Sequence, residues 1–356
     1  MAPKHSGSIP DPLPTQETSV TQGSTPTRAR RALLTSLGLC GALVLAPAAW
    51  AQAQAQGYPD KPVRLVVPYP PGGATDVIGR VLAQQLSEKL GQQFIVDNRA
   101  GAGGSLGAGQ VGKSPADGYT LLMGAFTSHS INAALQPRTV PFDIEKSFSM
   151  VSIVGTVPLV FVVNPEVKAN TLGELIALAK AKPGSLAFAS AGNGSPQHLS
   201  TEMFKRMAGV DVLHVPYKGS GPAMTDLIGG QVQAMIETAP AAQGHVKAGK
   251  LRALATTTTE AVASLPGVPT AASAGLPGFT VSSMFGIAAP AGTPADIVNK
   301  LNAALKDILA RADVKDQLLA QGAIATHTSP ADAAKAVSAE FAKWAKVIKD
   351  GNIVVE

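Results

Sequence analysis

The stretch VRLVVPYPPGGATD, residues 63–76, decides how the rest of the chain can be arranged. It begins with an apolar, β-branched run that is typical of a buried strand, and it continues through a turn rich in proline and glycine. Apolar residues then recur at helical spacing as far as Leu90, and Gly91 is placed to end the helix. The stretch therefore predicts a strand, a loop and a helix.

The loop of this unit has the features of an anion-binding turn. Pro68, Pro70 and Pro71 stiffen it, while Gly72 and Gly73 remove the Cβ atoms that would keep a ligand from the backbone. In open α/β sheets ligands bind at the carboxyl ends of strands, where the first amides of the next helix are unpaired. The pattern predicts a cradle for a carboxylate, although an ordinary strand-to-helix connection without a ligand has the same pattern.

The same order of elements returns along the chain. Strands are expected near residues 93–96 and 119–123, and the latter is followed by an expected polar loop over 124–130. Residues 158–164 predict a strand that stops at a proline, and residues 186–208 repeat the sequence of strand, Gly/Pro turn and helix. This alternation predicts a doubly wound α/β fold, and its two Gly/Pro turns suggest two lobes that face one ligand.

The first fifty residues indicate export. Residues 1–27 are rich in Pro, Ser, Thr and Gln, and are expected to form a disordered leader. Arginines at 28, 30 and 31, the apolar run 32–49 and an A-x-A site predict a secretory signal peptide cleaved near Ala51. The general and the twin-arginine routes both remain open. An uncleaved membrane anchor is the alternative, with an apolar run that is marginal for a bilayer.

Composition excludes several classes of function. With 356 residues, 45% of them hydrophobic and 15% charged, the chain can form a large core and two domains. Its one cysteine, Cys40, lies in the predicted signal peptide, so the mature chain is expected to lack disulfides and thiolate metal sites. Histidines stand singly, and no run of Lys and Arg indicates nucleic acid. No metal and no cofactor are predicted.

Two motifs match catalytic or nucleotide-binding patterns but lack their context. Residues 107–114, GAGQVGKS, fit the phosphate loop, yet no buried strand precedes them, so a close-packed helix between Ser105 and Lys113 is predicted instead. Residues 103–107 fit the nucleophile elbow, but the strand ends too early, and Ser105 is predicted to cap the following helix. A secreted hydrolase that uses Ser105 or Ser195 with a histidine remains the alternative from another class.

Several blocks together resemble a known family. Residues 66–76, VVPYPPGGATD, look like the signature loop of the Bug-type extracytoplasmic solute receptors, the binding components of tripartite tricarboxylate transporters. The match extends from about Tyr58 to the C-terminus. Blocks similar to later family motifs follow in the same order, at 98–104, 117–122, 192–199, 214–219, 265–270 and 289–294.

The resemblance implies a fold and a role. The fold would be the two-lobed type II periplasmic-binding-protein fold, each lobe a mainly parallel sheet flanked by helices. Lobe one would comprise 58–164 plus 281–356 and lobe two 165–280, after the leader and signal peptide of 1–51. The protein would be a periplasmic, monomeric receptor and not an enzyme. It would close by a hinge on a small organic carboxylate and deliver it to membrane transporter subunits. A ligand sensor for a membrane signalling partner would have the same fold.

The resemblance also implies which residues bind the ligand, mainly through main-chain amides. Asp76 is equally compatible with a helix cap, and Tyr217 with a core position. Glu237 stands where many family members have aspartate, and Met284 where an aromatic residue is common, so the ligand cannot be named from the sequence. The implied set is Tyr69, Gly73, Ala74, Asp76, Phe126, Thr127 and Ser128 from lobe one, with Ser190, Ala191, Asn193, Ser195, Tyr217 and Glu237 from lobe two.

Overall fold

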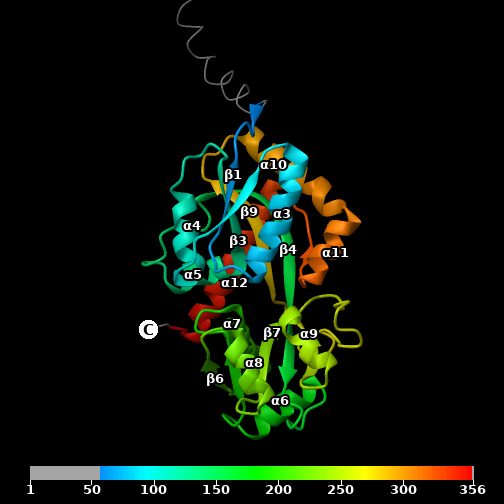
Figure 1. The fold of residues 1–356 in the computed structure, drawn as a ribbon. Helices are drawn as coiled ribbons and strands as arrows, with labels where there is room; N and C mark the ends of the chain where they lie inside the picture. The colour runs from blue at the N-terminus through cyan, green and yellow to red at the C-terminus, as the bar shows by residue number, and fades with distance from the viewer. Residues whose placement is uncertain (1–56, 355–356) are drawn as a thin grey trace, which may run out of the picture. The chain divides into compact units, whose positions relative to one another are not determined.

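The computed structural model describes residues 57–354. The predicted leader, signal peptide and cleavage site lie outside the described residues. Within this range strands and helices alternate as the sequence predicts, and the α/β fold class is confirmed. Figure 1 shows the strands gathered into two sheet regions with helices packed against them.

The first sheet region holds the decisive stretch. Three of its strands are parallel, and the remaining strand, which comes from late in the chain, runs antiparallel to them. The helix after the first strand begins at Ala74 and ends at Leu90, where Gly91 adopts the left-handed conformation that ends many helices. The strands are β1 (Val63–Val67), β2 (Phe94–Asn98), β3 (Thr120–Ala125) and β9 (Ser282–Pro290).

One strand, β4 (Phe148–Val163), belongs to both sheet regions (Figure 1). Its first part pairs with β9, and the last of these pairs joins Pro158 to Ser282. From Leu159 onward β4 pairs instead with β7 and, after one more residue, with β8. Proline cannot donate a backbone hydrogen bond, so its place at the change of partners costs the ladder little.

The second sheet region again combines parallel and antiparallel pairs. β5 is parallel to both β6 and β7, whereas β7 and β8 are antiparallel to β4. A short strand, β10 (Ile324–Ala325), pairs with the first part of β4. The other strands are β5 (Ala187–Ser190), β6 (Leu213–Pro216), β7 (Ala234–Thr238) and β8 (Arg252–Thr256).

Most helices follow a strand and pack against the sheets. Thr171 and Glu174 form the N-terminal cap of the helix after β4, because the Thr171 side chain accepts the Glu174 N–H. The helices are α3 (Ala74–Leu90), α4 (Ser105–Gly112), α5 (Phe126–Leu135), α6 (Leu172–Ala181), α7 (Pro196–Ala208), α8 (Ser220–Ile228), α9 (Ala239–Lys247), α10 (Ala295–Ala310), α11 (Ala312–Ala320) and α12 (Pro330–Gly351).

The last helix, α12, contributes to two hydrophobic clusters. Near its start, Ala333 and Val337 pack in a cluster built on the first sheet region. Further along, Trp344 is fully buried in a cluster with Phe161, which lies in the second part of β4. The helix therefore connects the two sheet regions in addition to β4, and its position depends on apolar burial at both ends.

Two local expectations are wrong, and one strand was missed. The polar loop expected over 124–130 is a helix from Phe126 onward, because Phe126 is fully buried beneath β9 and anchors its first turn. The strand over 148–157 was not expected, because register shifts near Met150 and Ile153 break the alternation of apolar and polar residues. Ser105 is the first helical residue of α4, whose N-cap is Gly104.

The segment that fits the phosphate-loop pattern, residues 107–114, lies largely in the close-packed helix that the sequence predicts. α4 covers Ser105–Gly112 and follows a short 3-10 turn (Ala102–Gly104) in place of a strand. A Cβ at Gly107 would lie 2.5 Å from the Arg99 carbonyl oxygen, and one at Gly109 would lie 2.5 Å from Pro141 Cγ. The glycines allow close packing of the helix, and within 57–354 no helix is long and apolar enough to cross a bilayer.

Replacing Trp344 by alanine is expected to reduce the free energy of unfolding by about 3–5 kcal/mol. The substitution removes a fully buried ring and the hydrogen bond from its indole N–H to Glu340 Oε1, 2.7 Å away. Urea denaturation measures the loss. Lys346→Ala on the exposed side of the same helix is the control, and equal stability of both variants would contradict the anchoring role of Trp344.

Candidate functional site

The carboxyl ends of the parallel strands from the two sheet regions point toward the same level of β4. β3 runs in the direction of β4, because each is antiparallel to β9, whereas β7 runs against it. The end of β3 lies level with Gly155 and the end of β7 with Leu159. At about 3.3 Å per residue these levels are about 13 Å apart along β4. The loops that follow both sets of strands therefore meet at this junction.

The N-terminus of α3 opens at this edge with its amides uncapped. Gly73 is the N-cap and has no side chain to accept the first amides, and Gly73 and Ala74 are both exposed. The backbone of Gly73 is extended, with φ −80° and ψ 168°, so other residues can adopt it. The unpaired amides and the helix dipole together favour an anion here.

Asp76 holds the loop in front of α3. Its carboxylate is almost fully buried and accepts the Gly72 N–H at 2.9 Å, the Asn98 side chain at 2.9 Å and the guanidinium of Arg80. Burial alone would raise the pKa of Asp76, but these hydrogen bonds outweigh it and lower the pKa. Both carboxylate oxygens accept hydrogen bonds from protein groups. The Asp76 side chain therefore holds the loop in shape, and its hydrogen-bonding positions are already used within the protein.

The N-terminus of α5 is the second uncapped helix start at this edge. It follows β3 directly, and its N-cap, Ala125, makes no side-chain cap hydrogen bond. Phe126 is core, and the Thr127 hydroxyl bonds to the Ser282 carbonyl, Glu340 and the Met284 N–H. Ser128 is half-buried. These residues therefore offer backbone amides, while the Phe126 and Thr127 side chains fix the helix in place.

A set of buried polar side chains, Tyr69, His129 and Ser130, lies beside these two helix starts. The Tyr69 hydroxyl, both ring nitrogens of His129 and the Ser130 hydroxyl are buried and have no hydrogen-bond partner among the described residues. The rings of Tyr69 and His129 stack with centroids 6.1 Å apart, and a Cβ at Gly104 would collide with the Tyr69 hydroxyl. Burial raises the pKa of Tyr69, against a smaller opposing effect of the nearby Ser128 side chain, so the phenol keeps its proton. Burial lowers the pKa of His129 to about 4, so the imidazole is neutral.

The Gly/Pro turn of the second sheet region uses most of its amides internally. Gly192 donates its N–H to Ser190 Oγ, Gly194 donates to His198 Nδ1, and the Ser195 side chain caps α7 by accepting the His198 N–H. Pro196, the first residue of α7, has no N–H. This turn therefore offers fewer free amides than the sequence suggested, because side chains from the end of β5 and the start of α7 already accept them.

Two stacked histidines support this turn. The rings of His198 and His214 lie 4.1 Å apart with 13° between their planes, and His214 Nε2 is 2.6 Å from Ser190 Oγ. Burial is the main reason that the pKa of each ring falls to about 4; the charge of Lys205 contributes to both, and the neighbouring His198 contributes to that of His214. Both rings are therefore neutral near neutral pH, as the hydrogen bond from Gly194 to His198 requires.

Other predicted residues of this half lie around the same edge. Ala191 is half-buried and Asn193 is exposed on the turn. The Tyr217 hydroxyl donates to Asp226 at 2.7 Å, and burial together with this hydrogen bond raises its pKa to about 12. The hydroxyl of the half-buried Tyr217 is thus satisfied locally.

Glu237 is the least satisfied polar residue of the second half. It is fully buried at the end of β7, and its Oε1 accepts the Gln197 side-chain N–H at 3.0 Å and the Thr238 backbone N–H at 2.6 Å. Its Oε2 is buried and has no partner among the described residues, which also supply no cation to pair with it. A buried carboxylate oxygen without a donor is costly.

The two halves touch on both sides of this edge. A Cβ at Gly194 would lie 3.2 Å from Leu135 Cδ2 at the end of α5. A Cβ at Gly322, in the turn before β10, would overlap Pro240 at the start of α9. The loops after β5 and β7 are therefore covered by segments of the first half in this arrangement.

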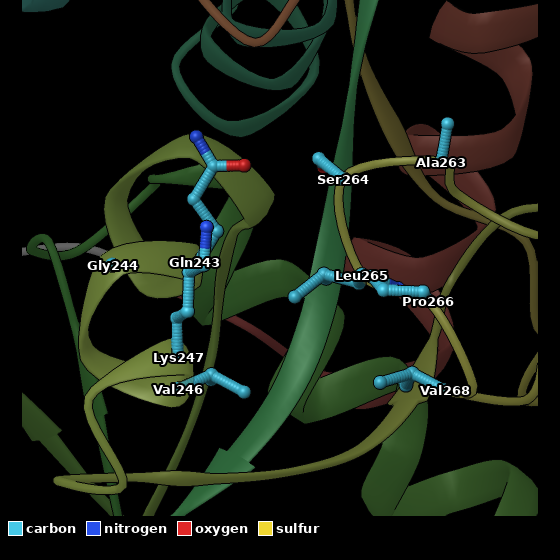
Figure 2. A pocket seen from close by; sticks show the side chains of 9 residues that line it. All are labelled: Gln243, Gly244, Val246, Lys247, Ala263, Ser264, Leu265, Pro266 and Val268. Atoms are coloured by element: carbon cyan, nitrogen blue, oxygen red, sulfur yellow. The ribbon is translucent and has the colours of Figure 1, made fainter.

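A pocket of about 690 Å³ lies elsewhere (Figure 2). It is formed by α9 and the segment 263–268, and Val246 and Leu265 point into it from opposite sides. None of the predicted ligand residues lines it. Across residues 57–354 no three His, Cys, Asp or Glu side chains gather as metal ligands would.

Sequence reasoning missed Gln197, Asn132 and Gly104. Gln197 positions Glu237, Asn132 donates to the Gly103 carbonyl and lies near Gly194, and Gly104 makes room for Tyr69. Gln197 directly follows the predicted turn, and this position in the first turn of a helix was the one sign in the sequence that it could reach the site. His129 lies within the loop expected over 124–130 near the ligand, but the sequence gave no sign of its contacts, which come from tertiary packing.

Comparison with known proteins identifies relatives over most of the chain. Residues 78–353 match the model of the tripartite tricarboxylate transporter family receptor. Protein BugT of Bordetella pertussis is 41% identical over 315 residues, which cover 88% of this chain and 96% of BugT.

Solved structures agree with this assignment. The Rhodopseudomonas palustris protein Rpa4515, solved with adipate, has a TM-score of 0.74 and 39% identity, with 83% of this chain and 99% of that chain covered. MatC from the same species, solved with bound malate, has a TM-score of 0.70 and 34% identity, with 82% and 100% covered. By sequence and by fold, the chain is a member of the tripartite tricarboxylate transporter receptor family, as its resemblance to Bug-type receptors predicts.

Proposed function

We propose that the protein is a periplasmic receptor that binds a small organic carboxylate at the junction of its two halves. The observation that carries this proposal is the pair of uncapped helix starts, α3 and α5, at an edge toward which the strands of the second half also point. Such amides bind an anion without a buried counter-ion. The unpartnered Tyr69 hydroxyl supplies a further donor.

The ligands of the relatives support the chemical class. Rpa4515 was solved with adipate and MatC with malate, both small dicarboxylates. We propose that the first half binds a carboxylate through Tyr69, Gly73, Ala74 and the amides of 126–128. Asp76 and Thr127 contribute indirectly. Asp76 holds the loop before α3, and Thr127 fixes the start of α5. The second half contributes Ser190, Ala191, Asn193, Ser195, Tyr217 and Glu237.

The ligand enters when the halves separate. We propose lobes of 58–164 plus 281–356 and of 165–280, with the later part of α12 packed against the second. Opening breaks the contacts at Gly194 and Gly322, and closing restores them around the ligand. The protein acts as a monomer after export and signal-peptide removal. It delivers the ligand to membrane transporter subunits. The alternative function, a ligand sensor, would use the same binding site but a membrane signalling partner.

Catalysis is not part of the proposed function. Ser105 is buried in α4, and the Ser195 hydroxyl caps α7 by accepting the His198 N–H. Within residues 57–354 neither hydroxyl donates a hydrogen bond to a base, as a serine nucleophile requires. Binding without turnover supports the receptor. Turnover of ester substrates that is lost on Ser→Ala substitution would support the secreted hydrolase instead.

A thermal-shift screen over dicarboxylates, tricarboxylates, acidic amino acids and aromatic acids is expected to find ligands that raise the melting temperature. Gly73→Val should abolish the shift, because its branched side chain covers the α3 amides. The fold should survive, since Gly73 has an extended backbone and the nearest atom to an added Cβ is the Pro70 carbonyl oxygen, 3.9 Å away.

Gly244→Val is the matched control for Gly73→Val. Gly244 also has room for a Cβ, but it lies on α9 at the pocket of Figure 2. Ligand shifts should therefore persist in this variant. Loss of binding in Gly244→Val with normal binding in Gly73→Val would move the site to that pocket and refute the proposed one.

Stability is expected to fall as the pH decreases from about 6.5 toward 4. Burial holds the pKa of His129, His198 and His214 near 4 in the folded chain, below their ordinary value of 6.5. The unfolded chain therefore binds more protons in this window, and acid favours unfolding. Melting temperatures measured across this range should drop, and ligand affinity should drop as the turn at 190–195 loses its support.

His198→Gln should make this acid dependence shallower, because an amide oxygen can accept the Gly194 N–H without titrating. His245→Gln, in the last turn of α9, should leave the dependence unchanged. An identical pH profile for His198→Gln and the wild type would rule out protonation of His198 as a cause.

A further inference from the structure

The two sides of the proposed site carry opposite hydrogen-bonding character. The first half presents donors, namely the amides at the starts of α3 and α5 and the buried Tyr69 hydroxyl. The second half presents an acceptor, the buried and unpartnered Oε2 of Glu237. α8 also begins after an uncapped glycine, Gly219, so the second half can hold an anion as well.

Two hydrogen bonds set the position of the Glu237 side chain. It stands at the end of β7, and its Oε1 is held by Gln197 from the first turn of α7 and by the Thr238 N–H. The Gln197 side-chain nitrogen also lies 3.4 Å from the Ser220 hydroxyl in the first turn of α8. The first turns of α7 and α8 therefore meet at Gln197, the side chain that holds Glu237 in β7.

These contacts decide which oxygen is left over. A carboxylate oxygen can only accept, so Gln197 must present its NH₂ group, and both donors use Oε1. Oε2 keeps its accepting capacity but has no donor among the described residues, and Glu237 has no exposed surface. Leaving such an oxygen unpaired costs stability, and sites that keep this cost are typically functional.

We propose that Glu237 Oε2 accepts a hydrogen bond from the ligand and so selects carboxylates that carry a hydroxyl or amino group. This inference rests on the proposed function and narrows its ligand class. The ligand's carboxylate lies toward the amides of α3 and α5, and its hydroxyl or ammonium group points toward β7. A ligand without such a donor leaves Oε2 buried and unpaired, which a closed site penalises.

Matched sets of probes test the inference by calorimetric titration. One set is succinate, L-malate and L-aspartate, and the other is glutarate, L-2-hydroxyglutarate and L-glutamate. In at least one set, the wild type should bind a donor-bearing member about ten-fold to a hundred-fold more tightly than the plain diacid. Plain diacids that bind equally well or better in both sets would overturn the inference and leave the carboxylate receptor standing.

Glu237→Gln should reverse the preference. Gln197 and Thr238 both donate to the position of Oε1, so the new amide must place its oxygen there and its NH₂ group where Oε2 was. A donor then faces the ligand, so hydroxyl and amino compounds should lose their advantage over plain diacids. The unliganded variant should be at least as stable as the wild type, because a neutral NH₂ group without an acceptor costs less to bury than a carboxylate oxygen without a donor.

Two further variants keep the test decisive. Glu237→Asp retains an acceptor and should keep the preference for donor-bearing ligands, which covers the case in which Glu237→Gln fails to fold. Glu166→Gln, at an exposed position after β4, should behave as the wild type. A preference that survives Glu237→Gln would refute the role of Oε2, and absence of binding by every carboxylate would refute the proposed function together with the inference.

Discussion

The structure depends on one continuous strand. β4 belongs to both sheet regions and exchanges β9 for β7 at Pro158, where no backbone donor is available. Because β3 runs with β4 and β7 runs against it, the carboxyl ends of both sets of strands must point toward the middle of β4. The junction is therefore a consequence of strand direction, and the loops at these ends need only suitable residues to become a binding site.

The two halves supply these residues by different means. In the first half, Gly73 and Ala125 leave the helix starts of α3 and α5 uncapped, and Asp76 and Thr127 hold the backbone in place. In the second half, Ser195 and His198 satisfy amides that a simple cradle would leave free. The result is a donor-rich side opposite a side with a buried acceptor, which suits an asymmetric ligand better than two equal anions.

The site also concentrates groups that are costly to bury. Tyr69, His129, Ser130 and Glu237 supply the buried side-chain atoms without partners among residues 57–354. Tyr69 lies in the loop after β1, His129 and Ser130 lie in α5, which follows β3 directly, and Glu237 lies next to the last residue of β7. Each unpaired atom reduces the stability of the unliganded chain. Ligand binding can recover part of this cost, so the same groups give a closed, occupied site an advantage over an empty one.

Sequence alone determined that the chain alternates strands and helices and carries loops suited to an anion. The segments that show this are residues 63–76, the Gly/Pro turn at 190–196, and the helical spacing of apolar residues after each. These features are local, because backbone preference and apolar spacing act over a few residues. The α/β class, the end of α3 at Leu90 and the helix at residues 105–112, which contains most of the phosphate-loop match, followed from them. The tertiary structure alone decided the remainder. Register shifts hid the first part of β4, buried Phe126 converted a polar stretch into α5, and Gln197 determined which oxygen of Glu237 stays free. The reason is that these outcomes depend on contacts between residues far apart in the chain, which neither spacing nor composition records.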